Sequence, residues 1–227
     1  MSDTHDNAHG VAQPAVDPSD EPAAETPAPA ATPTRKRPKP GERRVQILQT
    51  LATMLEQPGA ERITTAALAA RLSVSEAALY RHFASKAQMF EGLIEFIESS
   101  VFTLVNQILE RETSGAAQAQ RVVALVLQFG EKNPGMVRVM VGDALVFEHE
   151  RLTARMNQFF DRLESQLRQS LRASAEASGS NTPTVDANAL ASALLAFIVG
   201  RLQRYARSGF KRSPSEHLDM VLARLTV

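Results

Sequence analysis

Residues 64–86 contain a cluster of side chains that can donate hydrogen bonds or positive charge to an anion. The cluster combines hydroxyl, phenol, guanidinium, imidazole and ammonium groups, and it includes the adjoining residues Glu76 and Ala77. Its members are Thr64, Thr65, Ser75, Glu76, Ala77, Tyr80, Arg81, His82 and Lys86. Groups of these kinds contact phosphate oxygens in protein–DNA interfaces. Because Ser75 and Ala77 are small, the start of a helix there could approach base edges in the major groove. The cluster predicts a surface that binds double-stranded DNA.

Single members of this cluster also have ordinary structural explanations. Tyr80 could serve packing, His82 could be a surface or core histidine, and Glu76 could simply favour the start of a helix. Lys86 is less ordinary, because it falls in the first turn of a predicted helix, where the macrodipole disfavours a cation. A phosphate group bound beside Lys86 would remove that conflict.

Two short predicted helices, separated by a tight turn, position the cluster. Thr64 or Thr65 can cap the first helix, and Ser75 can cap the second, which is predicted to run to about His82. In the turn, Ser73 stands where glycine is usual, at a modest cost if its φ angle is positive. Two short helices across a turn of three or four residues form a helix-turn-helix. We therefore assign residues 41–86 to a DNA-binding domain.

The chain before this motif divides into an acidic tail and a basic arm. Residues 1–34 carry six of the 25 acidic residues and no Lys or Arg, so the rest of the chain has a formal net charge of +6. The tail has almost no large apolar residue, and we expect residues 1–40 to be disordered. The cations of the basic arm are Arg35, Lys36, Arg37, Lys39, Arg43 and Arg44. Arg43 and Arg44 are candidate phosphate contacts, although a solvated linker is the alternative.

Helical periodicity continues through residues 87–227, and the sequence predicts an all-α fold. A long helix opens at Ser85, with Gln88 placed to complete a capping box. Several further amphipathic helices would build a carboxy-terminal bundle. The helix predicted over 189–207 is apolar around most of its circumference, which favours a dimer contact. The alternative is a central place in the bundle of a single chain.

Several function classes are disfavoured by what the sequence lacks. There is no cysteine, which removes disulfides and thiolate metal sites and fits a reducing compartment. We find no signal peptide and expect no membrane span. No phosphate loop, zinc motif or nucleophile triad is present, so we expect neither an enzyme nor a cofactor. His149 between Glu148 and Glu150 is the nearest metal candidate, but adjacent residues on a helix diverge.

The sequence of residues 63–86, ITTAALAARLSVSEAALYRHFASK, resembles the DNA-binding domain of TetR-type regulators. A narrower resemblance lies outside that domain. It consists of LIEFIE at 93–98, FGEKNPG at 129–135, ALVFEHERL at 144–152 and NQFFDRLESQLRQSLR at 157–172. These blocks are similar to the SlmA family of nucleoid occlusion factors, and the match covers nearly everything from residue 41 to about 210.

This resemblance implies a TetR-like fold and a homodimer on palindromic chromosomal sites, and leaves higher-order assembly on DNA open. It also implies a cytoplasmic, nucleoid-associated protein that antagonises assembly of the division protein FtsZ when bound to DNA. The groove for the FtsZ tail would include the following residues: Phe96, Leu125, Lys132 and Asn133. From the sequence alone, a buried position in the core is the favoured interpretation of Phe96.

Two residues of this groove depart from the family pattern. Leu104 stands where an Arg is expected, and Gln128 stands where a Gly is expected. The first removes a charge and the second would enlarge a close-contact position. A ligand-responsive transcriptional repressor is the alternative function, and it would need a roomy pocket within the carboxy-terminal bundle.

Overall fold

The computed structural model describes residues 41–57 and 62–225. The predicted tail (1–40) lies outside these residues. The described part contains helices and no strand. The α-helices, with the 3₁₀ helix η1, are α1 (Glu42–Leu55), α2 (Thr65–Leu72), α3 (Glu76–Tyr80), α4 (Lys86–Arg111), α5 (Gly115–Lys132), α6 (Pro134–Met140), η1 (Asp143–Leu145), α7 (Glu150–Ala177), α8 (Pro183–Arg207) and α9 (Leu218–Leu225). The predicted all-α class is confirmed.

Serine and threonine side chains start the helices around the turn. Thr64, Ser75 and Ser85 each accept a hydrogen bond from the backbone N–H three residues later, at 3.1, 3.3 and 3.2 Å. The open choice of cap is thus resolved in favour of Thr64. The third helix is shorter than predicted, because α3 ends at Tyr80 and the chain turns there. Ser73 between α2 and α3 has the left-handed conformation that the sequence suggested, with φ of 54°.

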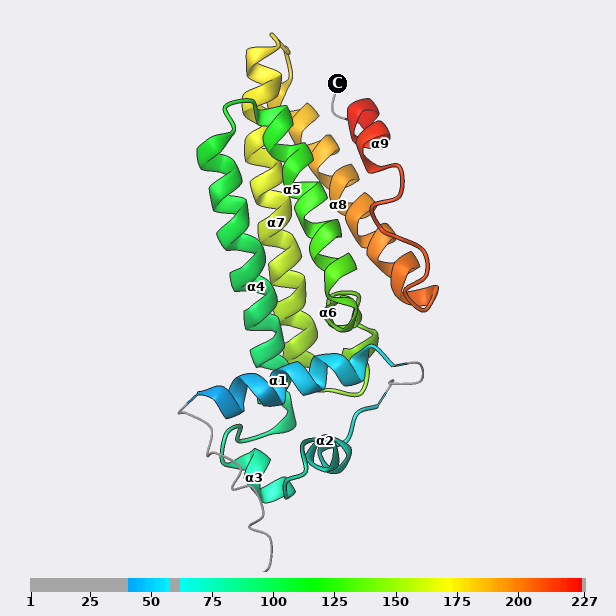
Figure 1. Cartoon of the computed structure of the whole chain (residues 1–227). Helices are drawn as coiled ribbons and strands as arrows, with labels where there is room; N and C mark the ends of the chain where they lie inside the picture. The colour runs from blue at the N-terminus through cyan, green and yellow to red at the C-terminus, as the bar shows by residue number, and fades with distance from the viewer. Residues whose placement is uncertain (1–40, 58–61, 226–227) are drawn as a thin grey trace, which may run out of the picture. The chain divides into compact units, whose positions relative to one another are not determined.

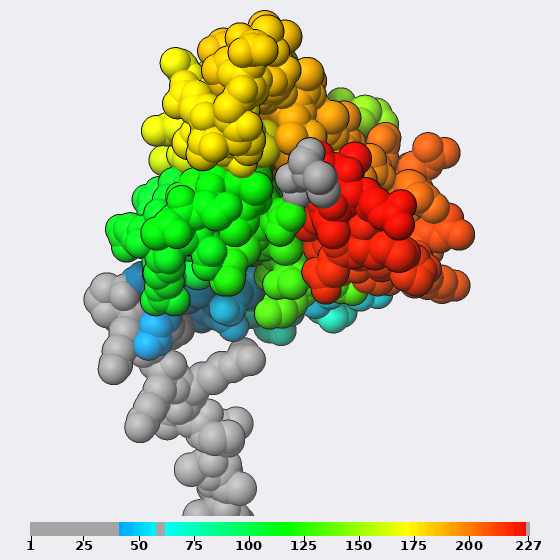
Figure 2. Space-filling view, turned by 90° about the horizontal axis from the view of Figure 1, so that it is seen from above, coloured from blue at the N-terminus to red at the C-terminus, as the bar shows by residue number. Residues whose placement is uncertain are grey.

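Four long helices, α4, α5, α7 and α8, pack side by side, and α1 lies across one end of this bundle (Figure 1). Their inward side chains form the core, in which residues such as Leu93, Val126, Leu163 and Leu194 are fully buried. Figure 2 looks onto the opposite end, where the α4–α5 connection, the α7–α8 connection and α9 occupy separate sectors of the surface. The bundle therefore carries α1–α3 at one end only.

The contact between α1 and α6 is unusually close. A side chain at Gly135, in the first turn of α6, would place its Cβ 2.1 Å from the carbonyl oxygen of Ala52 on α1. Only glycine permits the two backbones to approach in this way. The contact fixes α1, and with it the adjoining short helices, against the bundle.

Two helices meet the length and composition of a membrane span, contrary to the expectation that none would. They are α4 and α8, with mean hydropathy of 1.2 and 1.5 in their most apolar windows. Core helices of helical bundles can also be this long and apolar, and nine residues of α4 are buried in this structure. Composition alone therefore carries no membrane assignment for either helix.

One face of α8 combines small size with exposure. Its exposed or half-buried small residues recur at helical spacing and comprise Ala189, Ser192, Ala193, Ala196 and Gly200. A Cβ added at Gly200 would meet no atom within 4 Å. The opposite face, with Ala191 and Ile198, is buried against the bundle. α8 is thus partly central in the single chain and partly open to a neighbour.

Candidate functional site

The exposed side of α3 and its flanking turns gathers most of the residues that the sequence singled out. Ser75, Glu76, Ala77, Arg81 and His82 are all exposed. Tyr80 is 46% exposed, so its phenol is not a packing group. Leu79 and Phe83 point the other way into the core and are 1% exposed. This amphipathic arrangement presents hydroxyl, guanidinium and imidazole groups on one surface.

Thr65 and Glu76 are bonded to each other rather than left open. The Thr65 hydroxyl donates to Glu76 Oε2 at 2.6 Å, and Thr65 is half-buried. This bond joins the start of α2 to the start of α3 across the turn. The two residues therefore position α3, while Thr64 remains exposed beside them.

The two arginines of α1 also make contacts within the protein. Arg44 Nη1 donates to the carbonyl oxygen of His82 at 2.7 Å, and its guanidinium carbon lies 4.0 Å from the centroid of the Phe83 ring. Arg43 Nη1 donates to Gln46 Oε1 at 2.7 Å. Arg44 thus anchors the end of α3 to α1, a role that the sequence analysis did not anticipate.

Lys86 has an anion beside it already, because it forms an ion pair with Glu148 in the segment before α7. The carboxylate of Glu148 therefore relieves the conflict between Lys86 and the start of α4 without a phosphate, and the contact of Lys86 with DNA stays a prediction. The neighbouring cap is also modified. Gln88 Oε1 accepts from the N–H of Ala84 at 2.8 Å, one residue before the position that a capping box would use.

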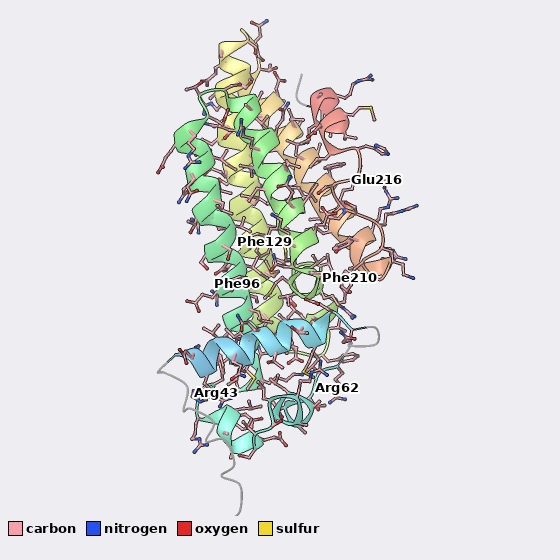
Figure 3. The ribbon with its side chains drawn as sticks, viewed as in Figure 1. Arg43, Arg62, Phe96, Phe129, Phe210 and Glu216 are labelled. Carbon is pink, nitrogen blue, oxygen red and sulfur yellow. The ribbon has the colours of Figure 1, made fainter. Side chains whose placement is uncertain are left out.

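A second candidate surface lies on α4 and α5, where two aromatic side chains face each other. Phe96 on α4 is 46% exposed, so the interpretation of Phe96 as plain core is wrong. Its ring centroid lies 6.4 Å from that of Phe129 on α5, and Figure 3 shows the pair between the two helices, above α1. Phe129 was missed in the sequence because its neighbours Val126 and Leu127 suggested a continuous buried stripe.

Beyond the aromatic pair, a surface groove of ≈ 380 Å³ runs between α4 and α5. Its lining residues are Leu104, Gln107, Ile108, Arg111, Glu112, Arg121, Ala124, Leu125 and Gln128. Leu125 lines this groove, whereas Phe96, Lys132 and Asn133, which the resemblance placed with it, are not among the lining residues. Gln128 is exposed and lines the groove, so its effect on partner binding stays a prediction. Leu104 is 42% exposed and adds apolar surface to the groove.

Lys132 and Asn133 lie at the end of α5 nearest Phe129. Lys132 is exposed. Asn133 is half-buried, and its Nδ2 donates to the carbonyl oxygen of Phe129 at 2.8 Å. That bond satisfies one of the carbonyl groups that a helix end leaves unpaired. Asn133 consequently shapes the end of α5, and Lys132 is the charged group available there.

The metal candidate around His149 is dispersed by other contacts. His149 Nδ1 accepts from the N–H of Arg151 at 3.2 Å and caps α7, while Glu148 is paired with Lys86. Among residues 41–57 and 62–225, no three His, Asp or Glu side chains lie close enough to hold a metal ion.

The family comparisons match both ends of the described region. Residues 47–93 match the bacterial regulatory proteins of the tetR family. Residues 114–226 match the family described as tetracyclin repressor-like, C-terminal domain, of SlmA-like type.

Individual relatives are similar over most of the chain. The nucleoid occlusion factor SlmA of Photobacterium profundum is 53% identical over 182 residues, which cover 80% of this chain and 92% of the relative. The protein of the same name from Salmonella paratyphi B is 53% identical over 178 residues, 78% and 89% of the two chains.

Solved structures with lower identity share the fold. The TetR family transcriptional regulator PfmR from Thermus thermophilus has a TM-score of 0.65 at 20% identity and covers 80% of this chain and 94% of its own. The regulator FadR from Bacillus subtilis, in complex with stearoyl-CoA, has a TM-score of 0.64 at 13% identity, with 80% and 97% covered. The predicted TetR-like architecture is confirmed.

Proposed function

Because the chain belongs to the SlmA family of TetR-type nucleoid occlusion factors, we propose that it binds palindromic chromosomal sites and there antagonises assembly of FtsZ over the nucleoid. The identity to these relatives favours this function over the ligand-responsive repressor. On this proposal the protein acts in the cytoplasm on the nucleoid and is no enzyme.

The exposed surface of α3 supports the DNA-binding half of the proposal. Ser75 and Ala77 present little bulk at the start of the helix, so that end enters the major groove. Tyr80, Arg81 and His82 flank it with groups suited to phosphate contact. Thr65, Glu76 and Arg44 keep α3 in place from behind. Lys86 would contact a phosphate while it remains paired with Glu148. Arg43 and Thr64 complete the DNA-binding surface.

The exposed face of α8 supports a homodimer. Its small side chains allow a second helix to approach closely, and their apolar character favours removal from water. Two reading heads of such a dimer reach successive major grooves about 34 Å apart. Replacing Ala193 by Glu should therefore give monomers by light scattering, whereas Thr103→Glu, at another exposed position, on α4, should leave the mass unchanged.

The observation that carries the FtsZ-binding half is the exposed ring of Phe96, which contacts half-buried Phe129 beside the groove. An exposed aromatic side chain next to a groove is a common anchor for a bound peptide. Leu125 adds apolar wall, and Lys132 offers a cation to a carboxylate of the bound tail. Asn133 holds the end of α5 and so places Lys132.

The test is an FtsZ polymerisation assay in the presence of the DNA that the protein occupies in its own cell, mapped by crosslinking and sequencing. Wild-type protein with its DNA should shorten or disperse FtsZ polymers. Phe96→Ala should lose this effect while keeping DNA affinity. The matched control is Met220→Ala, which removes another apolar side chain of comparable exposure (60%) on α9.

Two results would contradict the proposal. One is a binding map confined to a few promoters, which favours the repressor. The other is FtsZ polymerisation that wild-type protein leaves unaltered at saturating DNA.

A further inference from the structure

The groove between α4 and α5 combines apolar and polar lining residues and has two arginines at one end. Beyond the other end, Lys132 is exposed on α5, one turn after the lining residue Gln128, and is not itself a lining residue. The two arginines are Arg111 and Arg121, both of which line the groove. Between them and Lys132 lie Leu104 and Leu125. Leu104 and Arg111 lie two turns apart on one face of α4. Leu125 and Lys132 likewise lie two turns apart on one face of α5.

The far end of the groove keeps a surplus positive charge. Arg121 Nη2 lies 2.9 Å from Glu112 Oε1, so these two charges largely offset each other. Arg111 makes no ion pair within the part of the chain that the structure describes. It is exposed and sits in the last turn of α4. Arg111 is therefore the cation that this end can offer to a bound carboxylate.

The dimensions of the groove suit a short extended segment. Lys132 and Arg121 are about 17 Å apart along α5 at a rise of 1.5 Å per residue, which about five residues of extended chain would span. The volume of ≈ 380 Å³ accommodates a few side chains. Apolar contact is available only in the central stretch, around Leu104, Ile108 and Leu125.

We propose that this groove reads a peptide with an apolar centre and an acidic residue on each side, and that Arg111, with Arg121, recognises the acidic residue farther from Lys132. Arg111 thus supplies a positive charge at the end of the groove far from Phe96. Leu104, which stands where the family pattern has an Arg, supplies no charge. The inference rests on the proposed function, because it takes the FtsZ tail as the occupant.

The experiment measures binding of a fluorescent FtsZ tail peptide, with the sequence found in the same cell, to the DNA-bound full-length protein. Arg111→Glu should weaken binding by about tenfold and Arg121→Glu by less, since charge reversal replaces attraction by repulsion. Asn106→Glu is the matched control: it adds negative charge to an exposed position of α4 outside the groove lining, and should change binding less than twofold.

Peptide variants complete the test. Changing each acidic residue of the peptide to Lys in turn should identify one position that weakens binding to wild-type protein and restores binding to Arg111→Glu. If Arg111→Glu and Arg121→Glu bind the native peptide as wild-type protein does, the inference fails and the proposed function stands. If wild-type protein does not bind the peptide at all, the FtsZ partnership fails and the inference with it.

Discussion

Arg155 on α7 holds the carboxylate of Glu98 on α4 at two points, with Nε–Oε1 and Nη2–Oε2 distances of 3.2 and 2.6 Å. The hydrogen bond to Glu98 raises the pKa of Arg155 further above its usual value. Arg151 pairs with Glu91 at 2.8 Å one turn nearer the start of α7, and Lys86 pairs with Glu148 just before that helix. Three ion pairs thus run along the α4–α7 seam.

Glu98→Gln should lower the free energy of unfolding by about 1 kcal/mol, because it removes the charge from a two-point but partly exposed pair. Glu95→Gln, the same change one turn earlier at an exposed position, should have little effect. Chemical denaturation at low and high salt measures both. Equal losses for the two variants would mean that the Arg155 contact contributes nothing particular to stability.

Gly135→Ala should destabilise the protein by about 1–3 kcal/mol, the usual cost of forced overpacking. The reason is the carbonyl oxygen of Ala52, which is backbone and cannot rotate away from the new methyl group. The affinity for DNA should fall as well, because α1 must shift relative to the bundle. Thermal denaturation and a DNA titration check the two effects, and an unchanged melting temperature would show that α1 and α6 separate easily.

Ser73→Gly should stabilise the protein by about 0.5–1 kcal/mol. A residue with a Cβ pays a steric cost in the left-handed region, which glycine avoids at some cost in entropy. Ser73→Ala retains the Cβ and should give no gain. Denaturant midpoints of the three proteins would decide the matter, and a gain for the alanine variant would contradict this account of the turn.

Arg81→Ala should weaken DNA binding at every sequence and lower the slope of log affinity against log salt by about one unit, as expected for loss of one phosphate contact. Arg172→Ala, an exposed arginine on α7 with a salt bridge to Glu176, serves as the control. A change in sequence preference with an unaltered salt slope would instead place Arg81 against base edges.

Tyr205 should make stability fall at alkaline pH. Burial, and after it the charge of Glu131, raises the pKa of Tyr205 above its ordinary value of 10.0, so the folded state holds the phenol proton more tightly than the unfolded state. The corresponding stability is complete below pH 10 and is lost as the pH rises from there through the raised pKa. Tyr205→Phe removes this dependence.

The same variant loses the hydrogen bond from the Tyr205 hydroxyl to the carbonyl oxygen of Glu131, at a cost of about 1 kcal/mol near neutral pH. Unfolding titrations between pH 8 and 11 should therefore show the two stability curves converging. Parallel curves would contradict the pKa assignment.

Local sequence patterns predicted the helices and their caps well. Thr64, Ser75 and Ser85 cap helices because each acts on an N–H three residues away, and such short-range geometry is visible in the sequence. The end of α3 was placed too late. Its last turn depends on Arg44, which binds the carbonyl oxygen of His82 from another helix.

The sequence predicted the types of residue on the candidate surfaces, but not which of them are exposed or already paired within the protein. Lys86 carries the charge that a phosphate contact needs, yet its partner Glu148 is distant in sequence. Phe96 fits a buried stripe of α4, yet α5 leaves nearly half of it exposed. In both cases the deciding neighbour is brought in by packing, and periodicity within one helix does not report it.

α4 is a single unbroken helix of 26 residues, about 39 Å long at 1.5 Å per residue. It starts at the turn that follows the reading helix and ends beside the groove. On the proposed function, this rigid helix holds a bound FtsZ tail at a fixed distance from the DNA duplex. Copies on neighbouring sites then present several tail-binding grooves at the same distance from the DNA. An FtsZ filament with many tails engages several grooves at once, with avidity that no single groove provides.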